Sequence, residues 1–132
     1  MSEYFETIVG RLGEVSFKKG DYIYIGSANS CLEFRLRRHL RRSKKIYWHI
    51  DYLLENEKVW VSQIWVIPKS IECEIANVFN KELSCEIVKK GFGSSDCKCL
   101  SHLFYIKDRE KIEKILKKTG FSIYYFFSNW FI

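Results

Sequence analysis

The segment from Tyr22 to Leu40 constrains the fold of this chain more than any other. Tyrosine and isoleucine alternate over residues 22–25, so the two tyrosines share one face of a strand and the two isoleucines share the other. A short polar loop begins at Gly26, and Asn29 or Ser30 can cap a helix over about residues 31–43. Leucines at positions 32, 36 and 40 give that helix one buried stripe. A strand, a tight loop and an amphipathic helix in succession predict a domain that mixes strands and helices.

The remainder of the chain supplies further elements of both kinds. Runs of β-branched and aromatic residues predict strands, and apolar residues at helical spacing predict helices. Pro68 ends one strand, Ser70 and Asp108 can cap the helices that follow them, and Gly120 ends the last helix. The expected strands are 4–9, 14–17, 58–67, 103–106 and 122–127, the expected helices are 49–56, 70–83 and 108–119, and 91–101 is a loop. We therefore expect a small α+β domain, with a mixed or antiparallel β-sheet flanked by helices.

Composition favours one folded domain over residues 1–132. Hydrophobic residues make up 47% of the chain and aromatic residues 17%, which excludes a disordered protein. The first nine residues lack the apolar stretch of a signal peptide, and no segment is long and apolar enough to span a membrane, so a cytoplasmic protein is expected. In that compartment the five cysteines are expected to be thiols or metal ligands.

Positive charge is concentrated in one short segment. The chain has a formal net charge of +6, and the segment from Glu33 to Lys45 alone accounts for that excess. Its basic residues are Arg35, Arg37, Arg38, Arg41, Arg42, Lys44 and Lys45. A solvated basic helix is one interpretation, but the near absence of opposite charges favours contact with a polyanion such as DNA.

Five sequence blocks, taken in order, resemble a known family. They are the strand with its Gly-Ser-Ala turn at 20–28, the Arg-His-Leu of the helix at 38–40, the Trp-His-Ile-Asp block at 48–54, the Glu-Cys-Glu helix at 72–74, and the Gly-Phe-Gly-Ser block at 91–104. Together they resemble the GIY-YIG nuclease superfamily over about residues 8–127. The closer resemblance is to an uncharacterised archaeal branch, whose domain also occurs fused to endonuclease III-type repair enzymes.

This resemblance implies a metal-dependent DNA endonuclease, with a role in DNA repair and a repair enzyme as a further partner. Tyr24 matches the second-motif tyrosine, Arg35 the helix arginine that binds the phosphate, and His39 the histidine one turn later. His49 lies where some members have another histidine. Glu74 matches the glutamate that holds Mg²⁺ or Mn²⁺, and Glu72 is the weaker candidate because two residues along a helix change the face. Basic residues 37, 38, 41, 42, 44 and 45 would follow the DNA backbone.

The family's first motif, a separate Gly-Ile-Tyr strand, has no clear counterpart. Gly20 and Tyr22 have the matching letters, but they run directly into the second motif, while Tyr4 offers a substitute from the first expected strand. We expect the first strand to be absent, truncated by the choice of start site, or replaced. Asp96 or Ser95 stands nearest to the family's late asparagine. These departures favour an alternative, a catalytically impaired nucleic-acid-binding module of the same fold.

The last cysteines raise a separate question. Cys97, Cys99 and His102, joined by Cys73, offer the thiolate and imidazole ligands that zinc prefers. Cysteines are also often buried simply as small apolar residues, and the serines and aspartate of the same block can shape the loop through side-chain hydrogen bonds. A structural zinc ion, and with it a small zinc-stabilised interaction domain, therefore remains a further interpretation.

Overall fold

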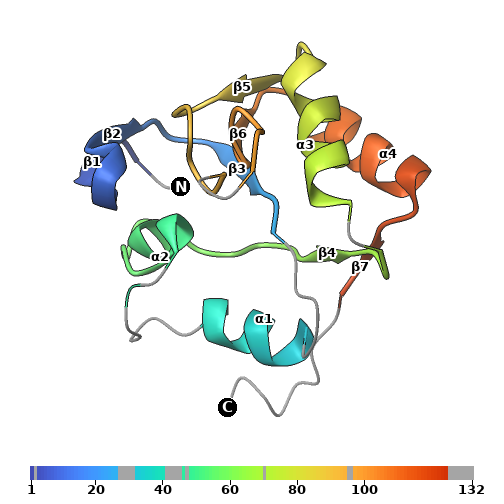
Figure 1. Cartoon of the computed structure of the whole chain (residues 1–132), viewed down its shortest axis with the longest axis horizontal. Helices are drawn as coiled ribbons and strands as arrows, with labels where there is room; N and C mark the ends of the chain where they lie inside the picture. The colour runs from blue at the N-terminus through green and yellow to red at the C-terminus, as the bar shows by residue number, and fades with distance from the viewer. Residues whose placement is uncertain are drawn as a thin grey trace.

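The structure is a computed structural model that describes residues 1, 3–26, 32–40, 46, 48–69, 71–94 and 97–124, with side chains in the first helix from Arg35 onward. Strands and helices are interspersed along the chain, and every strand pairing is antiparallel, which confirms the predicted α+β class (Figure 1). The elements in order are β1 (Phe5–Ile8), a 3₁₀ turn (Gly10–Leu12), β2 (Glu14–Phe17), β3 (Asp21–Tyr24), α1 (Leu32–Leu40), α2 (His49–Leu54), β4 (Trp65–Val66), α3 (Glu72–Lys81), β5 (Cys85–Ile87), β6 (Leu103–Ile106), α4 (Arg109–Thr119) and β7 (Ser122–Ile123).

The strands form three small antiparallel sheets. The largest has the order β3-β6-β5, while β1 pairs with β2 and β4 with β7. Of the strand expected over 58–67, the structure has β4, which pairs with the two residues of β7. In the expected strand at 122–127, the structure describes residues 122–124, and the Tyr124 amide donates to the Ile64 carbonyl at 2.8 Å.

The helix ends follow local capping chemistry in part. At α4 the Asp108 carboxylate accepts from the Lys111 amide at 3.2 Å, and Gly120 ends the helix at φ +114°, so both predicted signals are confirmed. At α3 the N-cap residue is Ile71, which makes no side-chain capping hydrogen bond. The predicted cap at position 70 lies outside the described residues.

Two hydrophobic clusters lie on either side of the β3–β6 pair. Leu103 faces one cluster and the next residue, Phe104, faces the other, as alternation along a strand requires. The hairpin cluster joins β1, β2 and α2 through Phe5, Val9, Val15, Phe17, Ile50, Leu53, Val59, Phe92 and Leu103. The helix cluster joins α3 and α4 through Ile25, Ile75, Ala76, Phe79, Phe104, Ile112 and Leu116.

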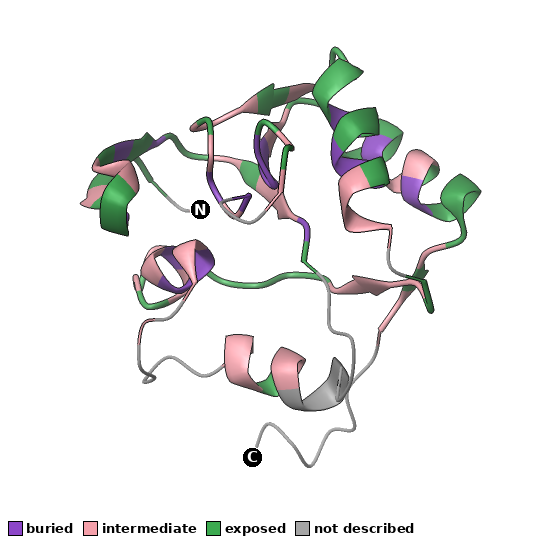
Figure 2. Ribbon diagram, in the orientation of Figure 1, coloured by how far each residue is buried: buried purple, intermediate pink, exposed green. Residues whose placement is uncertain are grey.

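Helix α1 is set apart from both clusters. It lies across β4 from the central sheet and from α3 and α4 (Figure 1). Its side chains at 35, 36 and 38–40 are only partly buried, while purple buried positions concentrate in α2, α3, α4 and β6 (Figure 2). None of the described helices has the length and apolar character of a membrane span.

Candidate active-site cavity and metal-ligand cluster

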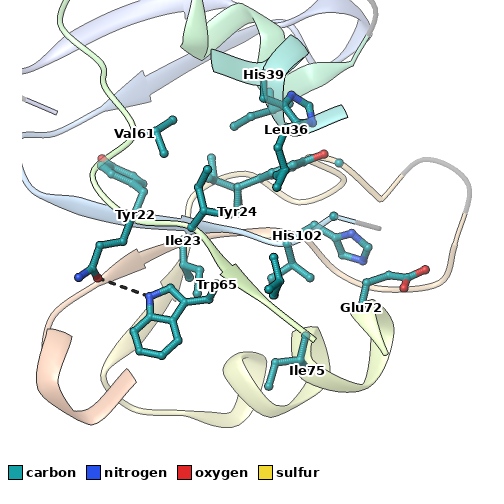
Figure 3. A pocket seen from close by; sticks show the side chains of 18 of the residues that line it. Tyr22, Ile23, Tyr24, Leu36, His39, Val61, Trp65, Glu72, Ile75 and His102 are labelled. Atoms are coloured by element: carbon teal, nitrogen blue, oxygen red, sulfur yellow. Dashed lines mark hydrogen bonds between the residues drawn. The ribbon is translucent and has the colours of Figure 1, made fainter. Parts of the chain in front are cut away.

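A cavity of about 1330 Å³ lies between α1, α2, β3, the start of α3 and the segment 59–69 (Figure 3). All four residues predicted to be catalytic contribute to its lining: Tyr24, Arg35, His39 and His49. They come from three different elements, β3, α1 and α2. The structure therefore brings together residues that lie up to 25 positions apart in the sequence.

Tyr24 is the last residue of β3 and is positioned by its neighbours on the loop after β5. Its ring meets Phe92 edge-on, with 6.4 Å between ring centroids. Gly93, at φ +70°, lies so close that a Cβ there would be 3.0 Å from Tyr24 Cε1 and 3.2 Å from His102 Cβ. A glycine is needed at this point both for the backbone conformation and for the space that Tyr24 takes.

Side chains of α1 pack against the ring of Trp48. The guanidinium carbons of Arg35 and Arg38 lie 4.8 and 4.4 Å from its ring centroid, and the His39 ring lies 5.5 Å away. These three residues follow the i, i+3, i+4 spacing of one helix face. The predicted common face of Arg35 and His39 is thus the face that packs on Trp48 and borders the cavity.

Arg38 has a structural role that the charge pattern did not reveal. Its two terminal nitrogens each donate to one carboxylate oxygen of Asp51 at 3.0 Å. Asp51 is completely buried, and it also accepts from the Trp48 amide at 2.8 Å. Asp51 thus supports the start of α2, and Arg38, which is also predicted to contact nucleic acid, is paired with it and only partly exposed.

The other predicted DNA-contacting residues divide into two groups. Arg37 is exposed on α1, on the side away from Trp48. Arg41, Arg42, Lys44 and Lys45 lie outside the residues that the structure describes.

His49 begins α2 and acts as a hydrogen-bond acceptor. Its Nδ1 accepts from the Gly93 amide at 2.9 Å, which assigns the proton of the neutral ring to Nε2. Burial lowers the pKa of His49, in keeping with a neutral imidazole. This residue therefore joins α2 to the loop that positions Tyr24.

The structure brings Glu72, rather than Glu74, to the cavity. Glu74 is exposed on α3 and is not among the lining residues, whereas Glu72 lines the cavity. The Glu72 Oε2 atom is buried and has no hydrogen-bond partner among the described residues. The prediction ranked these two glutamates in the opposite order. The spacing contains the missed signal, because Glu72 lies three and four residues before the buried Ile75 and Ala76.

The tyrosines considered for the missing first motif are placed differently. Tyr22 lines the cavity, but its hydroxyl donates to the Lys18 carbonyl at 2.8 Å, and burial raises its pKa to about 12. Tyr4 is 56% exposed beside Glu6 and is not a lining residue. Asp96 and Ser95 lie outside the described residues.

A second cluster lies beside the cavity. Cys73 from α3 meets Cys97, Cys99 and His102 from the loop before β6, and their ligand atoms all lie within 4.8 Å of one another. The Cys97 sulfur is 3.6 Å from His102 Nε2. His102 is buried and also lines the cavity. The predicted ligand set is thus assembled, and this cluster can hold a metal ion.

The electrostatics of the cluster also favour a cation. The pKa of Cys99 is raised to about 12, first by burial and then by hydrogen bonding with, and charge on, the neighbouring Cys73 and Cys97. The pKa of Cys73 is also raised, so a positive charge beside these thiols would favour their ionised form. Cys85 is different, because it packs against the helix cluster, where burial raises its pKa to about 11.

Comparison with known proteins identifies the family. Residues 1–124 match the family described as domain of unknown function DUF123, and the chain belongs to it. No curated protein and no solved structure matches the chain significantly.

Proposed function

We propose that this protein is a metal-dependent DNA endonuclease of the GIY-YIG type, acting in DNA repair. The observation that carries the proposal is the gathering of Tyr24, Arg35, His39 and Glu72 around one cavity. A fork-shaped cation, a phenol, an imidazole and a carboxylate are the groups that phosphodiester hydrolysis needs.

Each residue has a role that its chemistry allows. Arg35 binds the scissile phosphate, because a guanidinium is always charged and can donate two parallel hydrogen bonds. Tyr24 positions the attacking water or takes its proton, and His39 assists proton transfer. His49 holds the loop that supports Tyr24 through its bond to Gly93.

Glu72 is our candidate ligand for Mg²⁺ or Mn²⁺. A hard divalent cation prefers carboxylate oxygens, and Glu72 Oε2 is a buried oxygen without a hydrogen-bond partner in the described residues. The ion, when bound, would neutralise charge on the phosphoryl oxygens. Glu74, exposed on the same helix, would be dispensable.

Contact with DNA would extend beyond the cavity along the basic segment. Arg37 is exposed on α1, and positions 41, 42, 44 and 45 add four further positive charges. Such charges bind the phosphate backbone without reading sequence. Arg38 belongs instead to the protein interior, where it pairs with Asp51.

A non-catalytic nucleic-acid-binding module, docked to a repair enzyme, is the second candidate. This candidate is favoured because neither tyrosine considered for the family's first motif takes the place of that motif's tyrosine. Tyr22 uses its hydroxyl on Lys18, and Tyr4 is exposed away from the cavity, so neither supplies a second tyrosine hydroxyl to the candidate site.

We also propose that the Cys73, Cys97, Cys99 and His102 cluster holds Zn²⁺. Three thiolates and one imidazole form a Cys₃His set, a common structural zinc site. Soft sulfur ligands select against Mg²⁺ and Mn²⁺. The two metal sites would therefore be chemically distinct although both border the cavity.

Nicking of DNA tests the proposed activity. Supercoiled plasmid and branched DNA would be incubated with the protein and Mg²⁺ or Mn²⁺, alongside Arg35→Ala, Glu72→Gln and the matched control Glu74→Gln. We expect metal-dependent nicking by the wild type, a loss of about a hundredfold or more in the first two variants, and little change in the control.

Two results would contradict this proposal in different ways. Binding of DNA by the wild type without nicking would support the non-catalytic module. Loss of nicking in Glu74→Gln with retention in Glu72→Gln would reject Glu72 as the ligand while leaving the activity in place.

A further inference from the structure

We infer that the metal ion of the Cys₃His cluster ties the start of α3 to the loop 91–102, and so builds the wall of the cavity that carries Glu72. Glu72 directly precedes the ligand Cys73, and His102 is both a ligand and a lining residue. Figure 3 shows Glu72 and His102 on the same side of the cavity, apart from His39. This inference rests on the zinc occupancy proposed above.

The distances in the cluster suit tetrahedral zinc. With Zn–S bonds near 2.3 Å and Zn–N bonds near 2.05 Å, a tetrahedral site needs S···S distances of about 3.8 Å and S···N distances of about 3.6 Å. The Cys97–His102 pair is already at 3.6 Å, and all ligand atoms lie within 4.8 Å of one another. Closing the site therefore requires side-chain adjustments of about 1 Å or less, judged against that geometry.

A site with four protein ligands is closed. It leaves no position for water or substrate, which is the property of structural rather than catalytic zinc sites. The contribution of the cluster to activity must therefore pass through the positions of its neighbours.

The start of α3 needs such support. The first four amides of a helix have no partner within the helix, and a capping side chain usually satisfies one of them. At α4 the Asp108 carboxylate does this, but the N-cap residue of α3, Ile71, provides no side-chain cap. Because Cys73 lies in this first turn, a metal bond to its sulfur would hold the turn that Glu72 occupies.

The loop 91–102, which carries the other three ligands, is held to its neighbours by backbone hydrogen bonds. The Gly91 amide donates to the Leu100 carbonyl at 2.7 Å, and the His102 amide donates to the Phe92 carbonyl at 2.8 Å. The Ile25 amide donates to the His102 carbonyl at 2.9 Å, which joins the loop to the end of β3. The ion would thus connect α3 to the same loop that positions Tyr24.

Hydrogen exchange combined with metal analysis tests the tie without requiring activity. The full chain would be purified under reducing conditions, together with Cys73→Ser, Cys97→Ser and the control Cys85→Ser, whose cysteine lies outside the cluster. We expect about one zinc ion per chain in the wild type and control, and much less in the other two variants. Cobalt substitution of the wild type should give the intense visible bands of tetrahedral thiolate coordination.

Removal of zinc from the wild type by a chelator should accelerate amide exchange at least tenfold in residues 75–76, the first hydrogen-bonded amides of α3, and in 97–103. Exchange within α4 should change much less, and added zinc should restore the slow exchange. Because chelation uses the native sequence, this measurement stands even if Cys73→Ser fails to fold.

Three results would overturn this inference: no zinc or cobalt bound, a disulfide between cluster cysteines in the purified protein, or bound zinc whose removal leaves amide exchange at residues 75–76 unchanged. None of these measurements involves DNA. A protein that binds zinc and shows the exchange change but never nicks DNA would support the tie and reject the endonuclease. A protein that nicks DNA at full rate without zinc would reject the inferred role of the metal ion but leave the proposed endonuclease activity in place.

Discussion

The two walls of the cavity are attached to the protein by different kinds of contact. The α1 wall rests on Trp48 and on the Arg38–Asp51 ion pair, which are polar and cation–π contacts. The α3 wall is anchored by apolar residues of the helix cluster, such as Ile75 and Phe79, and it carries Cys73 of the cluster that can hold a metal ion. Polar and cation–π contacts thus hold the α1 wall, whereas apolar packing holds the α3 wall, to which the proposed zinc ion would add.

The largest effect is expected at the buried ion pair of the α1 wall. Asp51→Ala would leave the largely buried Arg38 guanidinium without its carboxylate partner and remove the acceptor of the Trp48 amide. We expect the free energy of unfolding to fall by about 3–5 kcal/mol, measured by urea denaturation. Glu86→Ala, which removes the exposed partner of Lys18 and Lys107, serves as the control and should cost less than about 1 kcal/mol. Equal losses in the two variants would show that the α1 wall does not depend on this pair.

A smaller effect is expected where the loop supports Tyr24. Gly93→Ala requires a positive φ from alanine and brings its Cβ to 3.0 Å from the Tyr24 ring. Gly10→Ala is the control, since its φ of +49° is also positive but the atom nearest to the added Cβ, the Tyr52 hydroxyl oxygen, is 3.5 Å away, an ordinary contact. We expect losses of about 2–3 kcal/mol and about 1 kcal/mol respectively in thermal or urea unfolding, with nicking reduced only in Gly93→Ala. Equal losses in the free energy of unfolding would mean that the Tyr24 ring moves aside for the added Cβ at no energetic cost.

The bond between His49 and Gly93 predicts a dependence of stability on pH. The pKa of His49 is lowered in the folded protein, so the unfolded chain binds its proton first as the pH falls below about 6.5. Stability is therefore retained above that pH and lost below it, with a slope of at most about 1.4 kcal/mol per pH unit for one proton. Urea denaturation between pH 7.5 and 5 should show this slope in the wild type and a shallower one in His49→Gln. Parallel profiles would remove His49 as the cause.

The smallest effect on stability is expected at the exposed side of α1. Arg37→Ala should change the free energy of unfolding by less than about 0.5 kcal/mol. If Arg37 contacts a phosphate, the slope of log affinity for DNA against log salt should become less steep by about 0.9. Arg38→Ala should show the reverse pattern, with a clear loss of stability, because Asp51 would remain buried without its partner. An unchanged salt slope in Arg37→Ala would place DNA on another surface.

Local patterns in the sequence predicted the α1 wall well. Arg35 and His39 are one helical turn apart, so their common face follows from helix geometry alone, and both line the cavity. The α+β class and both ends of α4 also followed from short-range signals. The pairing of Arg38 with Asp51 was not predicted, because Asp51 is buried in another helix and burial cannot be seen in a run of arginines.

The α3 wall was harder to predict because distant segments assemble it. The strand β5 has only three residues and is stabilised by pairing with β6, so it has no periodicity of its own. Glu72 was ranked below Glu74 because the resemblance outweighed the spacing to Ile75. The meeting of Cys73 with the loop cysteines was predictable only because thiolates and imidazole share a preference for one metal.

The alternation at Leu103 and Phe104 has a consequence for how this protein melts. One strand, β6, contributes a fully buried side chain to each hydrophobic cluster, so neither cluster can come apart without dislocating the strand that the other one needs. The two halves of the domain are therefore expected to share a single cooperative transition, with equal calorimetric and van't Hoff enthalpies. Heat that loosens the hairpin end of the molecule would at the same time release the helices that shape the far wall of the cavity.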